Sequence, residues 1–128
     1  MTDFTTKDSG KREDYASGMR RDTQDGKACF HLIVADGVPY GDQMLTRFAE
    51  LMDRGQVKYG ERNWEKANSR EEMERFKASG FRHLMQWLCG ETDEDHAAAV
   101  LFNIVAYEST KAKLERAKAM AGAALEDV

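Results

Sequence analysis

Several features are scarce in this chain of 128 residues, and each scarcity excludes a class of protein. There is one proline, there are two cysteines, and no apolar run approaches the roughly 18 residues that a membrane span needs. Cys29 and Cys89 stand in unrelated contexts without zinc-ligand spacing, so neither a zinc site nor a disulfide framework is expected. No signal peptide is recognisable. We therefore expect a cytoplasmic protein with reduced thiols and no membrane association.

The chain also lacks an excess of positive charge. Charged residues make up 33% of it, and the formal net charge is −4. A general nucleic-acid-binding protein would normally be basic, so that class is excluded. Alanine, glutamate, lysine, arginine and methionine, which favour helices, are plentiful instead. Because the length is that of one domain, these residues predict a single all-α domain.

The first 40 residues differ in pattern from the rest. Residues 1–40 are predicted to form an extended N-terminal arm, and residues 41–128 a single helical domain. A short apolar run, residues 30–34, interrupts the polar arm. This run is either a strand or a segment of the arm that packs onto the helices, and its length does not decide between them.

Three helices are predicted within residues 42–54, 69–89 and 93–120. The first carries an apolar stripe and should stop at Gly55. The second opens with a capping box, Ser69 followed by Glu72. Thr92 is the expected N-cap of the third helix, and Gly122 its end. A bundle of three such helices leaves apolar faces that one small chain covers poorly, which predicts a homodimer or homotetramer.

Acidic and imidazole groups gather where the second predicted helix ends and the third begins. Five of them are able to converge there: His83, Glu91, Glu94, Asp95 and His96. A hard divalent cation needs such a cluster of oxygen ligands, and Asn103 follows on the next helix. The alternative is that the acids only complement a helix dipole and that the histidines are hydrogen-bonded residues of the core. The spacing leaves both interpretations open.

A second chemical cluster is the segment Lys-Tyr-Gly-Glu-Arg-Asn-Trp, residues 58–64. Lys58 and Arg62 suit phosphate groups, while Tyr59 or Trp64 suits a nucleobase. The alternative is a surface loop that a buried Trp64 pins to the core.

Several segments in this order carry a resemblance to a known family: RRDTQDGK (20–27), DRGQVKYGERNWEK (53–66), RHLMQW (82–87), GETDEDHAAAV (90–100) and Asn103. They resemble a phage-encoded family described as dATP/dGTP diphosphohydrolase or MazG-like nucleotide pyrophosphohydrolase. The resemblance implies an all-α, MazG-like helical bundle that forms dimers or tetramers. It also implies Mg²⁺, with Mn²⁺ as the alternative, and conversion of a nucleoside triphosphate to its monophosphate and pyrophosphate. Such an enzyme would act on the nucleotide pool in the cytoplasm of a phage host.

The resemblance also implies roles for particular residues. Glu91, Glu94 and Asp95 would bind the metal, and together with His83 they form the expected catalytic set. Arg82 is expected to offset charge on the phosphates. The full set expected to contact the substrate is Lys58, Tyr59, Arg62, Asn63, Trp64, Arg82 and Asn103. The chain departs from the better known MazG pattern, because only Glu71 with Glu74 offers a first E-x-x-E pair, for which a solvated helical turn is the alternative.

A second class of function remains open. A non-catalytic helical module that binds a nucleotide or a host protein would need the aromatic and basic segment, but not a complete carboxylate set. Such a module would keep its binding function when Glu91 and Asp95 are neutralised, whereas an enzyme would not.

Overall fold

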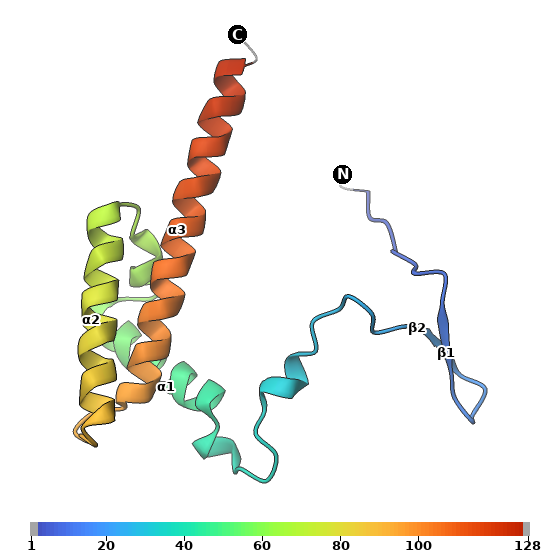
Figure 1. Cartoon of the computed structure of the whole chain (residues 1–128), viewed down its shortest axis with the longest axis horizontal. Coiled ribbons are helices and arrows are strands. Elements are labelled where there is room, and N and C mark those ends of the chain that lie inside the picture. The colour runs from blue at the N-terminus through green and yellow to red at the C-terminus, as the bar shows by residue number, and fades with distance from the viewer. Residues whose placement is uncertain (1–2, 127–128) are drawn as a thin grey trace. The chain divides into compact units, whose positions relative to one another are not determined.

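The computed structural model describes residues 3–126 and divides into two compact units, Met1–Ala35 and Asp36–Val128. The first unit holds two short strands, and the second holds three α-helices, labelled in Figure 1. Helices thus dominate the described part of the chain, and the predicted all-α class is confirmed. None of these helices combines the length and the apolar character that crossing a membrane demands.

The first unit is built around an antiparallel hairpin of β1 (Arg12–Asp14) and β2 (Arg20–Asp22). Opposite charges face each other across it, Arg12 opposite Asp22 and Asp14 opposite Arg20, and Arg20 Nε donates to Asp14 at 2.7 Å. Gly18 closes the turn with a positive φ of 90°. The polar segment that we expected only to be extended therefore contains a hairpin. Hydrophobic alternation could not predict it, because charge pairs hold it.

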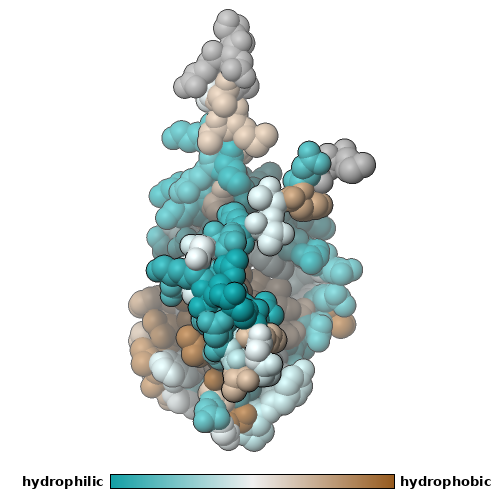
Figure 2. Space-filling model, turned by 90° about the vertical axis from the view of Figure 1, so that its right-hand side faces the viewer, coloured by the Kyte–Doolittle hydropathy of each residue, from teal (hydrophilic) through white to brown (hydrophobic). Residues whose placement is uncertain are grey.

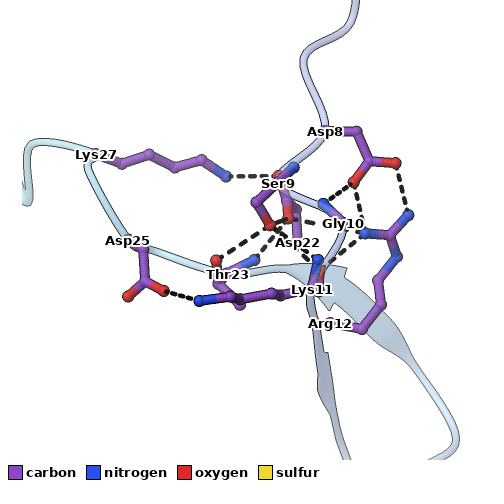
Figure 3. Close-up of polar contacts among 9 residues, drawn as sticks. All are labelled: Asp8, Ser9, Gly10, Lys11, Arg12, Asp22, Thr23, Asp25 and Lys27. Atoms are coloured by element: carbon purple, nitrogen blue, oxygen red, sulfur yellow. Dashed lines mark hydrogen bonds and ion pairs between the residues drawn. The ribbon is translucent and has the colours of Figure 1, made fainter.

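A network of polar contacts lies at the base of this hairpin (Figure 3). The Asp22 carboxylate accepts hydrogen bonds from the backbone N–H and the hydroxyl of Ser9. The Asp8 carboxylate accepts from Gly10 N at 2.8 Å and from the Arg12 guanidinium at 2.7 and 2.9 Å. The hydrogen bond from Arg12 is the main reason that the pKa of Asp8 lies well below its usual range. Isolated two-stranded hairpins are marginally stable, so we expect these contacts to stabilise this one.

The apolar run of the arm forms a 3₁₀-helix, η1 (Phe30–Ile33), so the strand interpretation of that run is wrong. Its large side chains are exposed, Phe30 at 77% and Leu32 at 75%.

Helix α1 (Met44–Tyr59) follows a short 3₁₀-turn, η2 (Tyr40–Asp42), and is longer than predicted. The expected stop at Gly55 is wrong, because the helix passes through that residue. It ends instead at Gly60, whose φ of 93° turns the chain and whose N–H donates to Gln56 O. A glycine costs a helix interior only about 1 kcal/mol, which neighbouring residues can offset. Lys58 and Tyr59 consequently lie on the last helical turn.

A third 3₁₀-turn, η3 (Asn63–Lys66), leads to α2 (Arg70–Leu88). The predicted capping box is confirmed: Ser69 Oγ accepts from Glu72 N at 3.2 Å, and the Glu72 carboxylate accepts from Asn68 N at 3.0 Å. Arg62, just before η3, has the left-handed φ of 57° that is uncommon outside glycine. The left-handed conformation of Arg62 thus sets the direction in which the chain enters η3.

Helix α3 (His96–Glu126) begins later and ends later than predicted. Asp95, and not Thr92, caps it, since Asp95 Oδ1 accepts from Ala98 N at 3.1 Å. The acids at positions 91, 93 and 94 therefore stand in the connection before the helix, not in its first turn. Gly122 does not end α3 either, because the helix continues to Glu126. Figure 1 shows α3 running antiparallel to α2 and continuing past the N-terminal end of α2.

Small residues dominate the core between α2 and α3. Met73, Ala98, Ala99 and Ala106 are buried, and none of the large side chains that the structure describes is fully buried. Gly80 allows the two helices to approach closely, since a Cβ added there would lie 3.0 Å from Asn103 Cβ. Other large apolar side chains come to the surface, and they include Phe81, Trp87, Leu88 and Ile104. Figure 2 shows hydrophobic surface, in brown, among the hydrophilic residues. The predicted dimer or tetramer, which would cover such surface, stays a prediction.

Candidate functional site

Two buried histidines meet where α2 ends and α3 begins. His83 lies near the end of α2 and His96 is the first residue of α3, and they are 8% and 2% exposed. Their Nδ1 atoms are 2.9 Å apart, and their rings are tilted by 39°. The short connection of residues 89–95 makes this contact possible, because it folds α3 back against α2.

Each of the two rings has a polar partner on its other nitrogen. His96 Nε2 lies 2.7 Å from Asp93 Oδ1, and this hydrogen bond is the main cause of the lowered pKa of Asp93. His83 Nε2 lies 3.4 Å from the Arg82 guanidinium. Burial, followed by the charge of Arg82, lowers the pKa of His83 from its usual value of 6.5. His83 is therefore neutral near pH 7, which is the form in which an imidazole binds a cation.

Carboxylates complete two groups of candidate metal ligands at this corner. Donor atoms of His83, Glu94 and His96 all lie within 4.8 Å of one another, and so do donor atoms of Glu91, Asp93 and His96. Of the three predicted metal ligands, Glu91 and Glu94 thus each lie in a group with His96. In both groups an imidazole contributes, so the donors are not carboxylates alone.

The third predicted ligand, Asp95, has other partners. The guanidinium of Arg47, on α1, donates to both of its oxygens at 2.9 and 2.6 Å. Asp95 also caps α3, and it lies in neither group of candidate ligands. In this structure Asp95 joins the start of α1 to the start of α3. Its metal role stays a prediction, while its structural role can be tested directly.

We expect Arg47→Met to destabilise the protein by about 1 kcal/mol at pH 6, as for a partly exposed ion pair with good geometry. The hydrogen bond from Arg47 is the main cause of the lowered pKa of Asp95, whose usual value is 3.8. Its contribution is complete above that value and is lost as the pH falls through the lower pKa of the folded state. Urea unfolding at pH 6 and below pH 3.5 should therefore show a difference between variant and wild type that shrinks in acid.

Asp95→Asn and Asp95→Ala separate the ion pair from the cap. Asparagine keeps a side-chain oxygen for the Ala98 N–H, so Asp95→Asn should resemble Arg47→Met. Asp95→Ala loses the cap as well, at a further cost of about 1 kcal/mol. Equal stabilities of the two Asp95 variants would rule out the capping role.

A cavity of about 1290 Å³ opens beside the corner, within the second unit. Its walls come from the C-terminal half of α1, from residues 60–64, and from the facing sides of α2 and α3. His83, Glu94, Asp95 and Asn103 lie on its lining, as do the aromatic rings of Phe76 and Phe102. A space of this size, lined by both charged and aromatic groups, suits a nucleotide.

The structure brings most of the predicted substrate residues to this cavity. Those on the lining are Lys58, Tyr59, Arg62, Asn63, Trp64 and Asn103, whereas Arg82 and Glu91 are absent from it. Lys58 Nζ lies 4.9 Å above the Tyr59 ring. Trp64 is half-buried and meets Phe102 edge to face at 6.3 Å, so it both packs on α3 and borders the cavity. Glu71 and Glu74 are exposed in the first part of α2, away from it.

The sequence did not point to three residues that support this site. Arg47 holds Asp95, and Arg54 lines the cavity. Lys113, on α3, donates to Ala67 O at 2.9 Å and also to Glu65 O, so it holds η3 and the residue that follows it against α3. The partners of Lys113 lie about fifty positions away along the chain, so no local motif could have indicated them.

A family model described as dATP/dGTP diphosphohydrolase, N-terminal, matches residues 16–121. The chain belongs to this family. The match includes β2, the three helices up to residue 121, and every residue of the corner and the cavity. No curated protein and no solved structure matches the chain.

Proposed function

We propose that the protein hydrolyses deoxynucleoside triphosphates to the monophosphate and pyrophosphate, with dATP and dGTP as the first candidates. The family description supports the substrate class. The observation that carries the proposal is the cavity itself, which joins the segment Lys58–Trp64 to the corner with His83 and Glu94. A role in the nucleotide pool of a phage host belongs to the same proposal.

The donors at the corner fit a divalent cation. Glu94, which lies on the cavity lining, is the proposed carboxylate ligand beside the substrate, and Glu91 belongs to a second group, with Asp93 and His96, as a further candidate ligand off that lining. Mg²⁺, the ion we expected first, commonly binds one or two carboxylates together with substrate phosphates and water. When bound, such an ion would neutralise phosphate charge and make a bound water more acidic.

The residues of the chain supply the remaining requirements of the reaction. A water oxygen attacks the α-phosphorus, the bond from that phosphorus to the bridging oxygen breaks, and pyrophosphate leaves. The proton of the water passes to a carboxylate oxygen of Glu94, which lies on the cavity lining, while His83 stays neutral beside it because burial and Arg82 lower its pKa. Lys58 would offset the phosphate charge, and Tyr59 and Trp64 offer rings for the base.

The experiment that tests this function is a screen of the common NTPs and dNTPs with Mg²⁺ and with Mn²⁺, measuring pyrophosphate and orthophosphate separately. We expect pyrophosphate and a monophosphate, formed fastest from dATP or dGTP. Release of orthophosphate alone would place the cleavage at another bond. If no nucleotide is hydrolysed, the chain is better explained as a non-catalytic binding module. One observation favours that alternative: Asp95 pairs with Arg47, which leaves fewer carboxylates to bind a metal.

Lys58→Ala should raise the KM for a triphosphate about tenfold or more, as expected when a hydrogen bond to a charged group is lost. Binding of the corresponding nucleoside should change little, because it has no phosphates for Lys58 to contact. Calorimetry with both ligands makes the comparison, and Lys118→Ala, on the exposed end of α3, is the control. Equal losses for the triphosphate and the nucleoside would remove the phosphate role of Lys58.

A further inference from the structure

The two histidines of the corner offer nitrogen ligands from buried side chains. His83 and His96 are buried, with Nδ1 atoms 2.9 Å apart, and a carboxylate oxygen of Glu94 completes a group within 4.8 Å. We infer that His83, His96 and Glu94 form a site for a first-row transition-metal dication, such as Mn²⁺ or Co²⁺, in preference to Mg²⁺. Only the catalytic role of the ion rests on the proposed function. Binding of the ion to the three residues can be measured without nucleotide.

The donor set decides the class of ion. Mg²⁺ takes oxygen ligands and binds imidazole poorly, whereas imidazole suits the first-row transition metals. Two imidazoles and one carboxylate form a set known from transition-metal sites, and they leave coordination positions free for water and phosphate oxygens. A purely acidic corner would have discriminated much less between Mg²⁺ and Mn²⁺.

The position of Asp93 supports the metal site independently, because a histidine that binds a metal needs a hydrogen-bond acceptor at its other ring nitrogen. Its carboxylate accepts from His96 Nε2 at 2.7 Å, which keeps the proton of the neutral ring on that nitrogen. The lone pair of His96 then lies on Nδ1, which faces His83. Histidines that bind metals usually donate their other ring N–H to a carboxylate or a carbonyl in this way. Asp93 is therefore a positioning residue for the site.

A competing arrangement accounts for the same distances without an ion. Arg82 approaches His83 Nε2 at 3.4 Å and can only donate, so His83 Nδ1 would carry the proton and donate it to His96. Binding of a metal through Nδ1 requires that proton to move to Nε2, so the Arg82 guanidinium has to move away from Nε2. The two arrangements make opposite predictions for metal affinity, so the choice between them is experimental.

The test is isothermal titration of the full chain, freed of metal by a chelator, with CoCl₂, MnCl₂ and MgCl₂. We expect Co²⁺ to bind more tightly than Mn²⁺ and Mn²⁺ more tightly than Mg²⁺, the order for nitrogen-containing sites. His83→Gln and His96→Gln should each raise the Kd for Co²⁺ on the order of 100-fold or more, and Asp93→Asn about tenfold. The visible spectrum of bound Co²⁺ should change in all three variants. His31→Gln, at the exposed third histidine, is the matched control and should change nothing.

The outcomes separate this inference from the proposed function. Equal Kd values for Co²⁺ in the wild type and in His83→Gln would overturn the inference, and so would equal affinities for Mg²⁺ and Co²⁺. If His96→Gln does not fold, Asp93→Asn still decides, because the Asp93 side chain is 65% exposed and its loss should leave the fold intact. Tight binding of Co²⁺ that depends on the histidines, without pyrophosphate release from any nucleotide, would support the site and refute the function.

Discussion

Glu94→Gln should lower the rate of pyrophosphate release by about 10²–10⁴-fold, the range expected when a group that acts directly on the reacting atoms is lost. Glu94 lines the cavity and lies in a ligand group with His83 and His96. Glutamine keeps its size but removes the charge that a cation requires. Steady-state kinetics with dATP and dGTP, at saturating Mg²⁺ and Mn²⁺, would measure the change.

Glu94→Gln should leave the stability of the folded protein almost unchanged. Glu94 is exposed, and surface substitutions usually change the free energy of unfolding by no more than about 0.5 kcal/mol. Glu108→Gln, on an exposed face of α3, is the matched control and should keep full activity. An active Glu94→Gln enzyme would show that the corner does not perform the chemistry, even if the nucleotide screen is positive.

Gly80→Leu should destabilise the protein by about 3 kcal/mol, at the upper end of the range for overpacking a core. Even a Cβ at Gly80 would lie 3.0 Å from Asn103 Cβ, and a leucine adds three more carbons at the crossing of α2 and α3. The helices would have to separate there, and Asn103 would move within the cavity lining. Urea unfolding followed by circular dichroism would measure the loss.

Gly55 provides the comparison, because it also lies inside a helix. A Cβ at Gly55 meets nothing within 4 Å, so Gly55→Leu should stabilise α1 by up to about 1 kcal/mol through helix propensity alone. The same replacement should therefore have opposite signs at the two glycines. Similar effects at both would mean that the contact of Gly80 with Asn103 is unimportant.

Local sequence signals predicted the helices well where the signal and its partner are close along the chain. The Ser69–Glu72 capping box is an example, and α2 begins where it indicates. At Gly55 the same kind of reasoning failed, because a second glycine five positions later has the positive φ that ends the helix. Thr92 is a good cap by type, but Asp95 also gains an ion pair with Arg47 and caps the helix instead.

The site was predicted in composition but not in its contacts. Five groups were predicted at one corner: His83, Glu91, Glu94, Asp95 and His96. The structure brings donors of all of them except Asp95 close together in two groups, and Asp95 pairs with Arg47 instead. Spacing along a helix did not indicate that Asp93 supports His96, since Asp93 stands before the helix. Arg47 and Lys113 reach across to partners 48 positions away, and only the folded chain defines such pairs.

The separation of contacts along the chain has a consequence for how the protein assembles. His83 and His96 are only thirteen positions apart, whereas Arg47 must find Asp95 across 48 positions. Contacts between near neighbours form faster, because less chain must be ordered to make them. The α2–α3 hairpin, with its pair of imidazoles, should therefore form first, and α1 should close the cavity afterwards. In native-state hydrogen exchange, α1 should open at a lower free energy than α2 and the first half of α3, leaving the corner folded while the cavity is open.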